Sequence, residues 1–190
     1  MRTINTIVPV FAILLIACDQ GSINDVPRER DQAITAAFKF PAVDSLARSY
    51  SAGLRLLTIH SSNVNFDGTS AIWIYEYLGT TPSIYCFHSI FHAVVFDSIS
   101  PVRDGVAIIS HSWFNTDVAL AIAEANGGSD FRSRNPSFSI TAFLTQPLVP
   151  NANTYWYITY RSGKDPSRVN LQIDAVSGKV ADYYEDRLRD

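Results

Sequence analysis

Cysteine is scarce in this sequence, which has two, Cys18 and Cys86. Two cysteines allow at most one disulfide, so a small fold held together by several disulfides is excluded. Basic runs are missing as well, and 15 basic residues against 18 acidic ones give a net charge of −3. Nucleic-acid binding normally needs a basic patch, so no nucleic-acid partner is expected. Binding to anionic lipid through charge is equally unsupported.

The apolar run near the N-terminus, residues 7–17, is too short for a permanent transmembrane helix and contains Pro9. A helix needs about 20 apolar residues to cross a bilayer. Arg2 precedes the run, and the small residue Ala17 ends it. A positive start, a short apolar core and small residues before a cleavage point are the three parts of a secretory signal. Residues 1–17 are therefore predicted to be a signal peptide.

The end of this run, Leu15-Ile16-Ala17-Cys18, resembles the lipobox of bacterial lipoproteins. That pattern has an aliphatic residue, a tolerant position, a small residue and cysteine, and all four positions match. The resemblance implies that Cys18 becomes the mature N-terminus and carries acyl chains such as palmitate. It places the protein in the bacterial cell envelope, held in the membrane by lipid and facing the periplasm or the exterior. An ordinary secretory signal that happens to contain a cysteine stays open.

Beyond Cys18 the chain is predicted to consist of a tether and a folded body. Residues 18–40 form the lipidated N-terminus and tether, residues 41–112 a first helix-plus-sheet unit, and residues 113–190 a second. Apolar spacing indicates helices over residues 43–57 and 118–125, the latter capped by Asn115 or Thr116 and stopped by Gly127-Gly128. Strand-like segments cover residues 71–78, 84–99, 106–109, 138–144, 155–161 and 169–175.

The expected fold class is α+β, with helix packed on antiparallel β-sheet, and two tandem similar units are an open alternative. Each half has a striped helix and then a strand that begins Trp-x-x-x-Tyr, at Trp73 and at Trp156. Self-similarity of this kind is typical of repeat architectures, but two copies of a common module are few. A true duplication is therefore left undecided.

The C-terminal half also resembles PepSY-like domains. The resemblance lies in Trp156–Tyr160 and in Val169–Val180, where a strand runs into Asp174-Ala175 and a Ser177-Gly178 turn. It covers residues 118–180 at most, and the first half lacks the Ser-Gly turn after Asp97. It implies a helix on antiparallel sheet, and a non-catalytic module that binds or restrains other proteins. The residues themselves indicate a structural role for Asp174, whose carboxylate can accept N–H groups of the turn.

No catalytic, metal or cofactor site is expected. Cys86, His88 and His92 have metal-ligand chemistry, but in one extended strand Cys86 and His92 would lie about 20 Å apart. Asp97 and Asp174 are each expected to serve a turn, and there is no Gly-x-Ser-x-Gly nucleophile motif. The protein is therefore predicted not to be an enzyme.

Alternation within strands sends Tyr155 and Tyr157 to one face and Trp156 to the other. The candidate binding surface consists of Tyr155 and Tyr157 with Trp73 and Tyr75 from the first half, because exposed aromatic residues mark contact surfaces. Packing in the core remains the alternative for these residues. The expected function is a lipid-anchored binding or inhibitory module with a protein or peptide partner in the envelope. The alternatives are a glycan- or small-ligand-binding lipoprotein and a structural subunit of an envelope complex.

Overall fold

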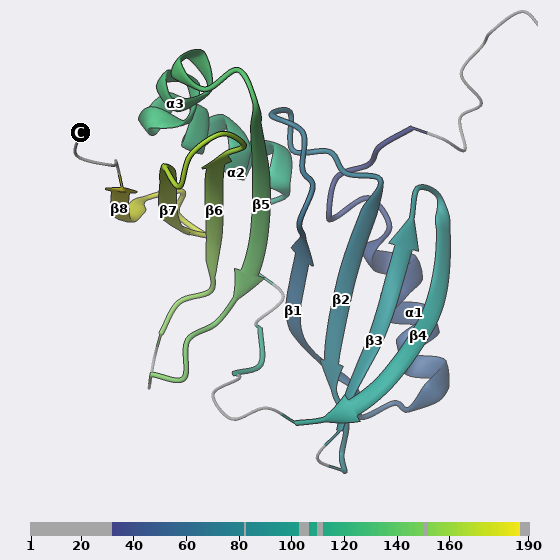
Figure 1. The fold of residues 1–190 in the computed structure, drawn as a ribbon. Coiled ribbons are helices and arrows are strands. Elements are labelled where there is room, and N and C mark those ends of the chain that lie inside the picture. The colour runs from purple at the N-terminus through teal and green to yellow at the C-terminus, as the bar shows by residue number, and fades with distance from the viewer. Residues whose placement is uncertain (1–31, 82, 103–106, 110–111, 150–151, 187–190) are drawn as a thin grey trace, which may run out of the picture.

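The computed structural model describes residues 32–81, 83–102, 107–109, 112–149 and 152–186. The lipobox, Cys18 and the predicted signal peptide lie outside these residues. The described part is mainly β, with one antiparallel sheet of eight strands in the order β4-β3-β2-β1-β5-β6-β7-β8 (Figure 1). The expected α+β class, with two tandem units as its alternative, is wrong. β1 pairs with β5, so the two halves of the chain build one continuous sheet.

Each half of the chain contributes four consecutive strands to this sheet. The first four are β1 (Arg55–Ser61), β2 (Ile72–Leu78), β3 (Ser83–Ile90) and β4 (Ala93–Pro101). The second four are β5 (Phe138–Thr145), β6 (Tyr155–Ser162), β7 (Arg168–Asp174) and β8 (Val180–Asp186). The strands predicted over residues 71–78, 138–144, 155–161 and 169–175 are confirmed as β2, β5, β6 and β7. The division into units at residue 112 stays a prediction.

The first helix, α1 (Phe40–Tyr50), is shorter than the predicted helix over residues 43–57. Pro41 suits its first turn, where no backbone donor is needed, and Val43 and Ala47 bury its inner side. The chain leaves the helix at Ser51, and Leu54 and Leu57 lie beyond it. A bulge between Leu56 and Thr58 places the consecutive residues Leu56 and Leu57 in buried positions of β1. The position of Leu57 therefore matches the apolar spacing of the helix by coincidence, although it belongs to a strand.

The second helical segment consists of α2 (Thr116–Ala123), the π-helical turn η2 (Glu124–Gly128) and α3 (Ser129–Arg134). The predicted cap is confirmed, because the Asn115 side chain accepts the backbone N–H of Thr116 at 2.9 Å. The predicted stop at Gly127-Gly128 is confirmed, because Asn126 and Gly127 have non-helical dihedral angles and Gly127 has φ of +112°, which glycine adopts without steric cost. A separate helix, α3, follows this break.

The core lies between the helices and one face of the sheet. Its largest side chains include Trp73, Trp156 and Tyr75, all fully buried. The indole N–H of Trp73 donates to the carbonyl of Ile34 at 2.7 Å, and the Tyr75 hydroxyl donates to the carbonyl of Ala36 at 2.7 Å. The buried polar ends of both side chains are thereby satisfied, and the segment before α1 is fixed across the helix-covered face.

The same segment connects the two halves of the chain. The backbone N–H of Ala36 donates to the Thr116 hydroxyl at 3.0 Å, and that of Ala37 donates to the Asn115 side chain at 2.9 Å. Asn115 in turn donates to the Thr35 hydroxyl at 2.7 Å. The start of α2 therefore holds the turn that leads into α1. The helical layers of the two halves are joined by these bonds, and their strands are joined by the pairing of β1 with β5.

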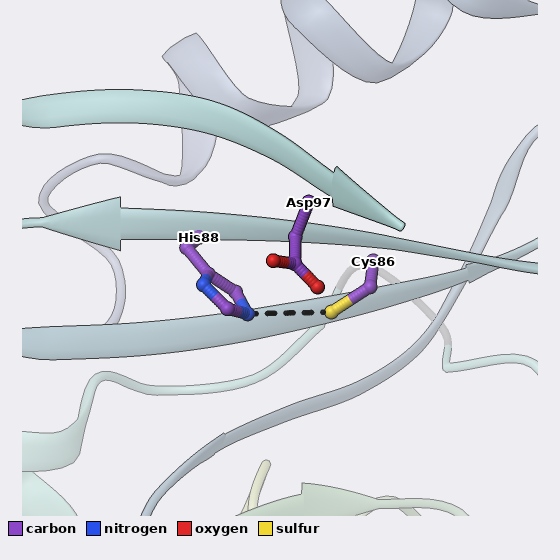
Figure 2. A group of neighbouring side chains, drawn as sticks. All are labelled: Cys86, His88 and Asp97. Carbon is purple, nitrogen blue, oxygen red and sulfur yellow. Dashed lines mark hydrogen bonds between the residues drawn. The ribbon is translucent and has the colours of Figure 1, made fainter. Parts of the chain in front are cut away.

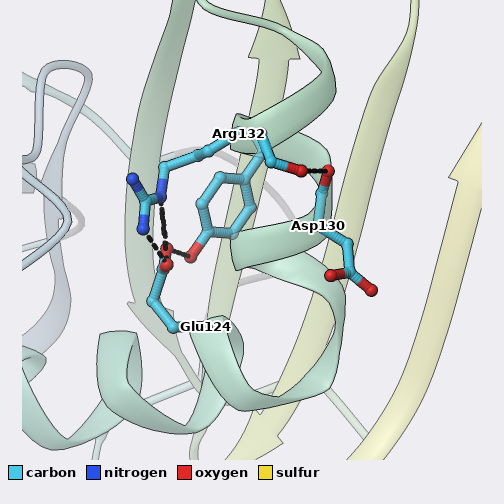
Figure 3. A network of polar contacts seen from close by, with 5 residues as sticks. Glu124, Asp130 and Arg132 are labelled. Atoms are coloured by element: carbon cyan, nitrogen blue, oxygen red, sulfur yellow. Dashed lines mark hydrogen bonds and ion pairs between the residues drawn. The ribbon is translucent and has the colours of Figure 1, made fainter.

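A charged network attaches α3 to the sheet. The Glu124 carboxylate accepts three hydrogen bonds from two nitrogens of the Arg132 guanidinium, and Figure 3 shows the two side chains directed at each other. The same carboxylate accepts the hydroxyl of Tyr160, a buried residue of β6, at 2.7 Å. Burial, and then the neighbouring carboxylate, raise the pKa of Tyr160. One acidic side chain thus ties η2, α3 and β6 together.

The turn between β7 and β8 agrees with the role predicted for Asp174. Its carboxylate accepts the backbone N–H of Ser177 at 2.7 Å and that of Val176 at 3.0 Å, and it also accepts the side-chain amide of Asn153. Gly178 has φ of +74°, the left-handed conformation expected from the sequence. These bonds, the one from Ser177 first, lower the pKa of Asp174 despite its burial. The structural role of Asp174 is confirmed.

Candidate functional site

The face of the sheet that the described helices leave uncovered is the candidate functional site, and it is called the open face here. Cross-strand pairing places one residue of every strand in a single row across it. This central row is Val95, His88, Ile74, His60, Phe143, Tyr157, Gln172 and Asp182. A parallel row holds Ser98, Cys86, Glu76, Thr58, Thr145, Tyr155 and Asp174.

Large apolar side chains stand on the open face. Ile72 is 44% exposed, Val95 40% and Phe143 36%. Tyr184, which pairs with Asn170 on the same face, is 51% exposed. Monomeric soluble proteins seldom expose large contiguous apolar patches unless those patches bind something. On the other face the central residues Trp73, Trp156 and Tyr160 are fully buried, whereas Ile99 and Tyr183 of the two edge strands are 54% and 44% exposed.

The predicted aromatic surface divides between the two faces. Tyr155 and Tyr157 lie half-buried on the open face, with ring centroids 6.4 Å apart, as the alternation in β6 predicted. Trp73 and Tyr75 do not join them, and their assignment to a binding surface is wrong. Both are fully buried on the helix-covered face, because the alternation in β2 directs them to the core together with Tyr77.

Sequence reasoning missed the residues of the first half that do reach the open face. Between Trp73 and Tyr75, the side chain of Ile74 points the other way and pairs with His60 of β1 and His88 of β3. The His60 ring lies against Phe143 of β5 with centroids 5.6 Å apart. The sequence did contain a signal for these residues, because period-two alternation assigns Ile72, Ile74 and Glu76 to the face opposite Trp73. The sequence did not show that β1 pairs with β5, and this pairing aligns these residues with Tyr155 and Tyr157.

A small cavity of about 300 Å³ adjoins this face at one end of β1 and β2. Ile72 and Ile74 form its apolar side, and Ser61, Asn63, Ser70 and His88 contribute polar groups. A larger cavity of about 570 Å³ lies beside α1 and is lined by Asp44, Arg48 and Arg55 among others. Neither of these two cavities is lined by tyrosine.

Three polar side chains with metal-ligand chemistry meet at one end of the open face. Cys86 and His88 are alternate residues of β3, and Asp97 reaches them from β4, as Figure 2 shows. Cys86 Sγ and His88 Nε2 are 3.5 Å apart, and the ligand atoms of all three lie within 4.8 Å of one another. His92, which was expected to lie too far along the strand to join Cys86, lies elsewhere: its ring centroid is 5.5 Å from that of Phe38.

Asp97 does not cap a turn, contrary to the expectation from the sequence. The segment over residues 84–99, predicted as one strand, is a hairpin whose bend holds Phe91 at φ of +50°. Cys86 pairs with Ser98 and Phe87 with Phe96, so Asp97 is the extra residue of a β-bulge. A bulge redirects the side chain that it inserts, and here Asp97 is directed towards Cys86.

The electrostatics of Cys86 do not fit a nucleophile. Burial, followed by the carboxylates of Asp97 and Glu76, raises the pKa of the Cys86 thiol to about 11. A reactive cysteine needs a lowered pKa so that the thiolate is present at neutral pH. The Glu76 carboxylate accepts the Thr58 hydroxyl at 2.8 Å and stays beside the thiol. This cluster therefore does not constitute an activated cysteine.

No helix within the described residues is both long and apolar enough to cross a membrane. No protein-family model matches the chain, so the resemblance to PepSY-like domains stays a prediction. No curated protein matches it either. Among solved structures, it is similar to a protein from Clostridium difficile 630 described as a "putative lipoprotein", with a TM-score of 0.54 and 13% identity over 76% of this chain and 90% of that one. At this identity the comparison shows that the two chains share a fold.

Proposed function

We propose that the protein is an exported, lipid-anchored module that binds a protein or peptide partner through the open face of its sheet and performs no catalysis. The observation that carries the proposal is that one face of an eight-stranded sheet is uncovered and bears exposed apolar side chains. A face of this kind offers contact area well beyond the cavity of about 300 Å³ at its margin, and so broad an area suits a macromolecule.

The composition of the central row supports contact with a protein. Phe143, Tyr157 and Ile74 give an aromatic and aliphatic centre. The row ends in polar residues at β7 and β8, and in the exposed Val95 at β4. Protein interfaces commonly have such an apolar centre with a polar rim, and tyrosine is enriched among the residues that dominate their energetics. The strands that carry these three residues, β2, β5 and β6, are each paired on both sides, so the centre of the surface is held in shape before a partner arrives.

The lipid anchor rests on Leu15-Ile16-Ala17-Cys18, and the fold shared with a protein described as a lipoprotein is consistent with it. Acyl chains contribute about 0.8 kcal/mol for each buried methylene, so two or more chains on Cys18 hold the body at a membrane. Fractionation of cells that express Cys18→Ala tests this part. We expect the variant protein in the soluble fraction or as uncut precursor, whereas membrane retention of correctly trimmed variant contradicts the anchor.

Capture of the protein from its native membrane in mild detergent, followed by quantitative mass spectrometry, tests the binding face. Phe143→Asp places a charge at the centre of the open face, and Val118→Asp places one on α2, where Val118 is 44% exposed. We expect a partner that is retained by the wild-type and Val118→Asp proteins and reduced at least about tenfold by Phe143→Asp, a loss of about 1.4 kcal/mol. The purified partner should show the same order of affinities.

Equal recovery of every associated protein by the two variants contradicts the assignment of the open face. Both variants must show the thermal unfolding temperature of the wild type, so that a loss of binding is not a loss of folding. Co-purification in fixed stoichiometry with several envelope proteins indicates instead the structural subunit considered from the sequence. The anchor and the binding face are tested separately, since Cys18→Ala leaves the sheet unchanged.

A further inference from the structure

The hairpin of β3 and β4 brings together three side chains of different donor chemistry. Cys86 offers sulfur, His88 nitrogen and Asp97 oxygen, and their ligand atoms lie within 4.8 Å of one another. The first two come from alternate residues of one strand, whose side chains share a face. The third arrives because the bulge in β4 inserts Asp97 opposite Cys86. The backbone of a paired hairpin therefore holds all three.

The distances agree with a tetrahedral metal centre. Zinc bonds of about 2.3 Å to sulfur and about 2.0–2.1 Å to nitrogen, at a tetrahedral angle, separate the two ligand atoms by about 3.6 Å. Cys86 Sγ and His88 Nε2 are 3.5 Å apart. The ligand atoms of the three residues lie within 4.8 Å of one another. Asp97 is exposed, so rotation of its side chain can bring a carboxylate oxygen closer to Cys86 Sγ and His88 Nε2. The two less mobile ligands are already at the required separation.

We propose that Cys86, His88 and Asp97 form a binding site for a divalent transition metal of the zinc class, with a fourth coordination position open to water or to a ligand. Thiolate and imidazole favour zinc over magnesium or calcium, which prefer oxygen ligands alone. Three protein ligands with one open position are the arrangement of zinc sites that bind an exchangeable group.

The surroundings suit a cation with an exchangeable ligand. Glu76 lies beside Cys86 on the neighbouring strand and adds negative charge. His88 also lines the cavity of about 300 Å³, so there is room for a small molecule next to one of the metal ligands. When the metal binds, the S–H bond of Cys86 breaks, a sulfur–metal bond forms and the proton passes to solvent. The cluster requires neither the lipid anchor nor a protein partner.

A metal titration of the full chain carrying Cys18→Ala tests the site, since Cys86 is then the only thiol. Cobalt(II) serves as the spectroscopic substitute for zinc, because a cobalt–thiolate bond gives a charge-transfer band in the near ultraviolet. We expect this band to saturate at one cobalt for each chain and to disappear when zinc is added. Isothermal titration with zinc alone should give the same stoichiometry.

Single substitutions of the ligands identify the site. Asp97→Asn, His88→Gln and Cys86→Ser should each weaken zinc binding at least about 100-fold, beyond the roughly 10–100-fold cost of altering an outer-shell group. Cys86→Ser should also abolish the charge-transfer band. His60→Gln is the matched control, because His60 lies on the same face but outside the cluster, and it should bind zinc like the parent chain.

The absence of a thiolate band overturns the proposal, and so does zinc binding that is unchanged by Asp97→Asn. Asp97 is exposed, so its substitution leaves the core intact, and circular dichroism with thermal unfolding verifies that each variant is folded. Equal weakening by His60→Gln would show that zinc binds to surface histidines instead of this cluster. None of these results would contradict the proposed binding of a protein partner, because Phe143 and Tyr157 lie in β5 and β6 and the metal ligands lie in β3 and β4.

Discussion

Replacing Asp174 by asparagine tests the hydrogen bonds that hold the turn between β7 and β8. The carboxylate accepts N–H groups from Ser177, Val176 and Asn153. Hydrogen bonds to a charged group contribute about 1.5–3 kcal/mol, and those between neutral groups about 0.5–1.5 kcal/mol. The amide oxygen of Asp174→Asn can still accept the two backbone donors, but each bond is weaker by about 1 kcal/mol. The amide nitrogen faces the Asn153 donor, which loses its acceptor.

The free energy of unfolding should therefore fall by about 2–3 kcal/mol at pH 7. For a chain of this size, each 1 kcal/mol lowers the midpoint of thermal unfolding by about 2–4 °C. Urea unfolding and calorimetry measure the two quantities. Asp182→Asn is the matched control, since Asp182 is an exposed aspartate of β8 whose carboxylate accepts only the adjacent N–H of Tyr183 among the bonds of the described residues. That variant should stay within about 0.5 kcal/mol of the wild type.

The effect of Asp174→Asn should also depend on pH, with a sign fixed by the lowered pKa. The hydrogen bonds, that of Ser177 first, hold the pKa of Asp174 below its ordinary value, which is about 3.9 in an unfolded chain. A carboxyl with a lowered pKa stabilises the folded state fully above the unfolded pKa, and this stabilisation is lost as pH falls through the folded pKa. The wild-type and variant unfolding curves should converge in that acidic range. A difference that stays constant from neutral pH to the acid limit refutes the assignment of the effect to the charge.

Two further substitutions test the interior. Tyr75→Phe should lower the free energy of unfolding by about 1–3 kcal/mol in urea titrations, because the buried carbonyl of Ala36 loses its donor; an unchanged value contradicts the bond. Glu124→Ala should cost about 2–4 kcal/mol, because it leaves Arg132 and the hydroxyl of Tyr160 without their shared acceptor. In a double-mutant cycle, Glu124→Ala and Tyr160→Phe should show a coupling of at least about 0.5 kcal/mol, and strict additivity would show that the two groups act independently.

The strands of the second half could be predicted from the sequence because their local pattern agrees with their place in the fold. In β6 and β7 buried and partly exposed positions alternate, as in any sheet with one covered face. The turn at Asp174 and Gly178 was predictable for a similar reason, because its residues have strong local preferences. In β6, β7 and the turn that follows β7, the burial pattern and the local conformational preferences both favour the structure that is observed.

β1 was missed because its burial does not alternate. Four consecutive positions from Leu56 to Ile59 are buried, since a bulge interrupts the strand and β1 lies at the centre of the sheet. A short, largely apolar run of this length is consistent with a helix or a strand, and the apolar stripe of the preceding α1 favoured the helix. Pairing with β5 makes this segment a strand, and β5 lies in the other half of the chain.

The cluster of Cys86, His88 and Asp97 could not be predicted for a related reason. Reading residues 84–99 as one strand placed Asp97 far from Cys86, and no glycine or proline marks the bend at Phe91. Once the hairpin is known, the meeting of the three side chains follows from the register. Sequence periodicity indicated which residues share a face within a strand, whereas proximity between strands required the pairing.

The position of β1 in the middle of the sheet has a consequence for how the protein is made. Thr58 pairs with Thr145 and Ser61 with Ala142, so one edge of β1 stays bare until the second half of the polypeptide has been synthesised. Unpaired strand edges readily join the strands of other molecules. A chain that is cut or stalled before Phe138 is thus a fragment prone to self-association, whereas the finished protein keeps that edge permanently closed.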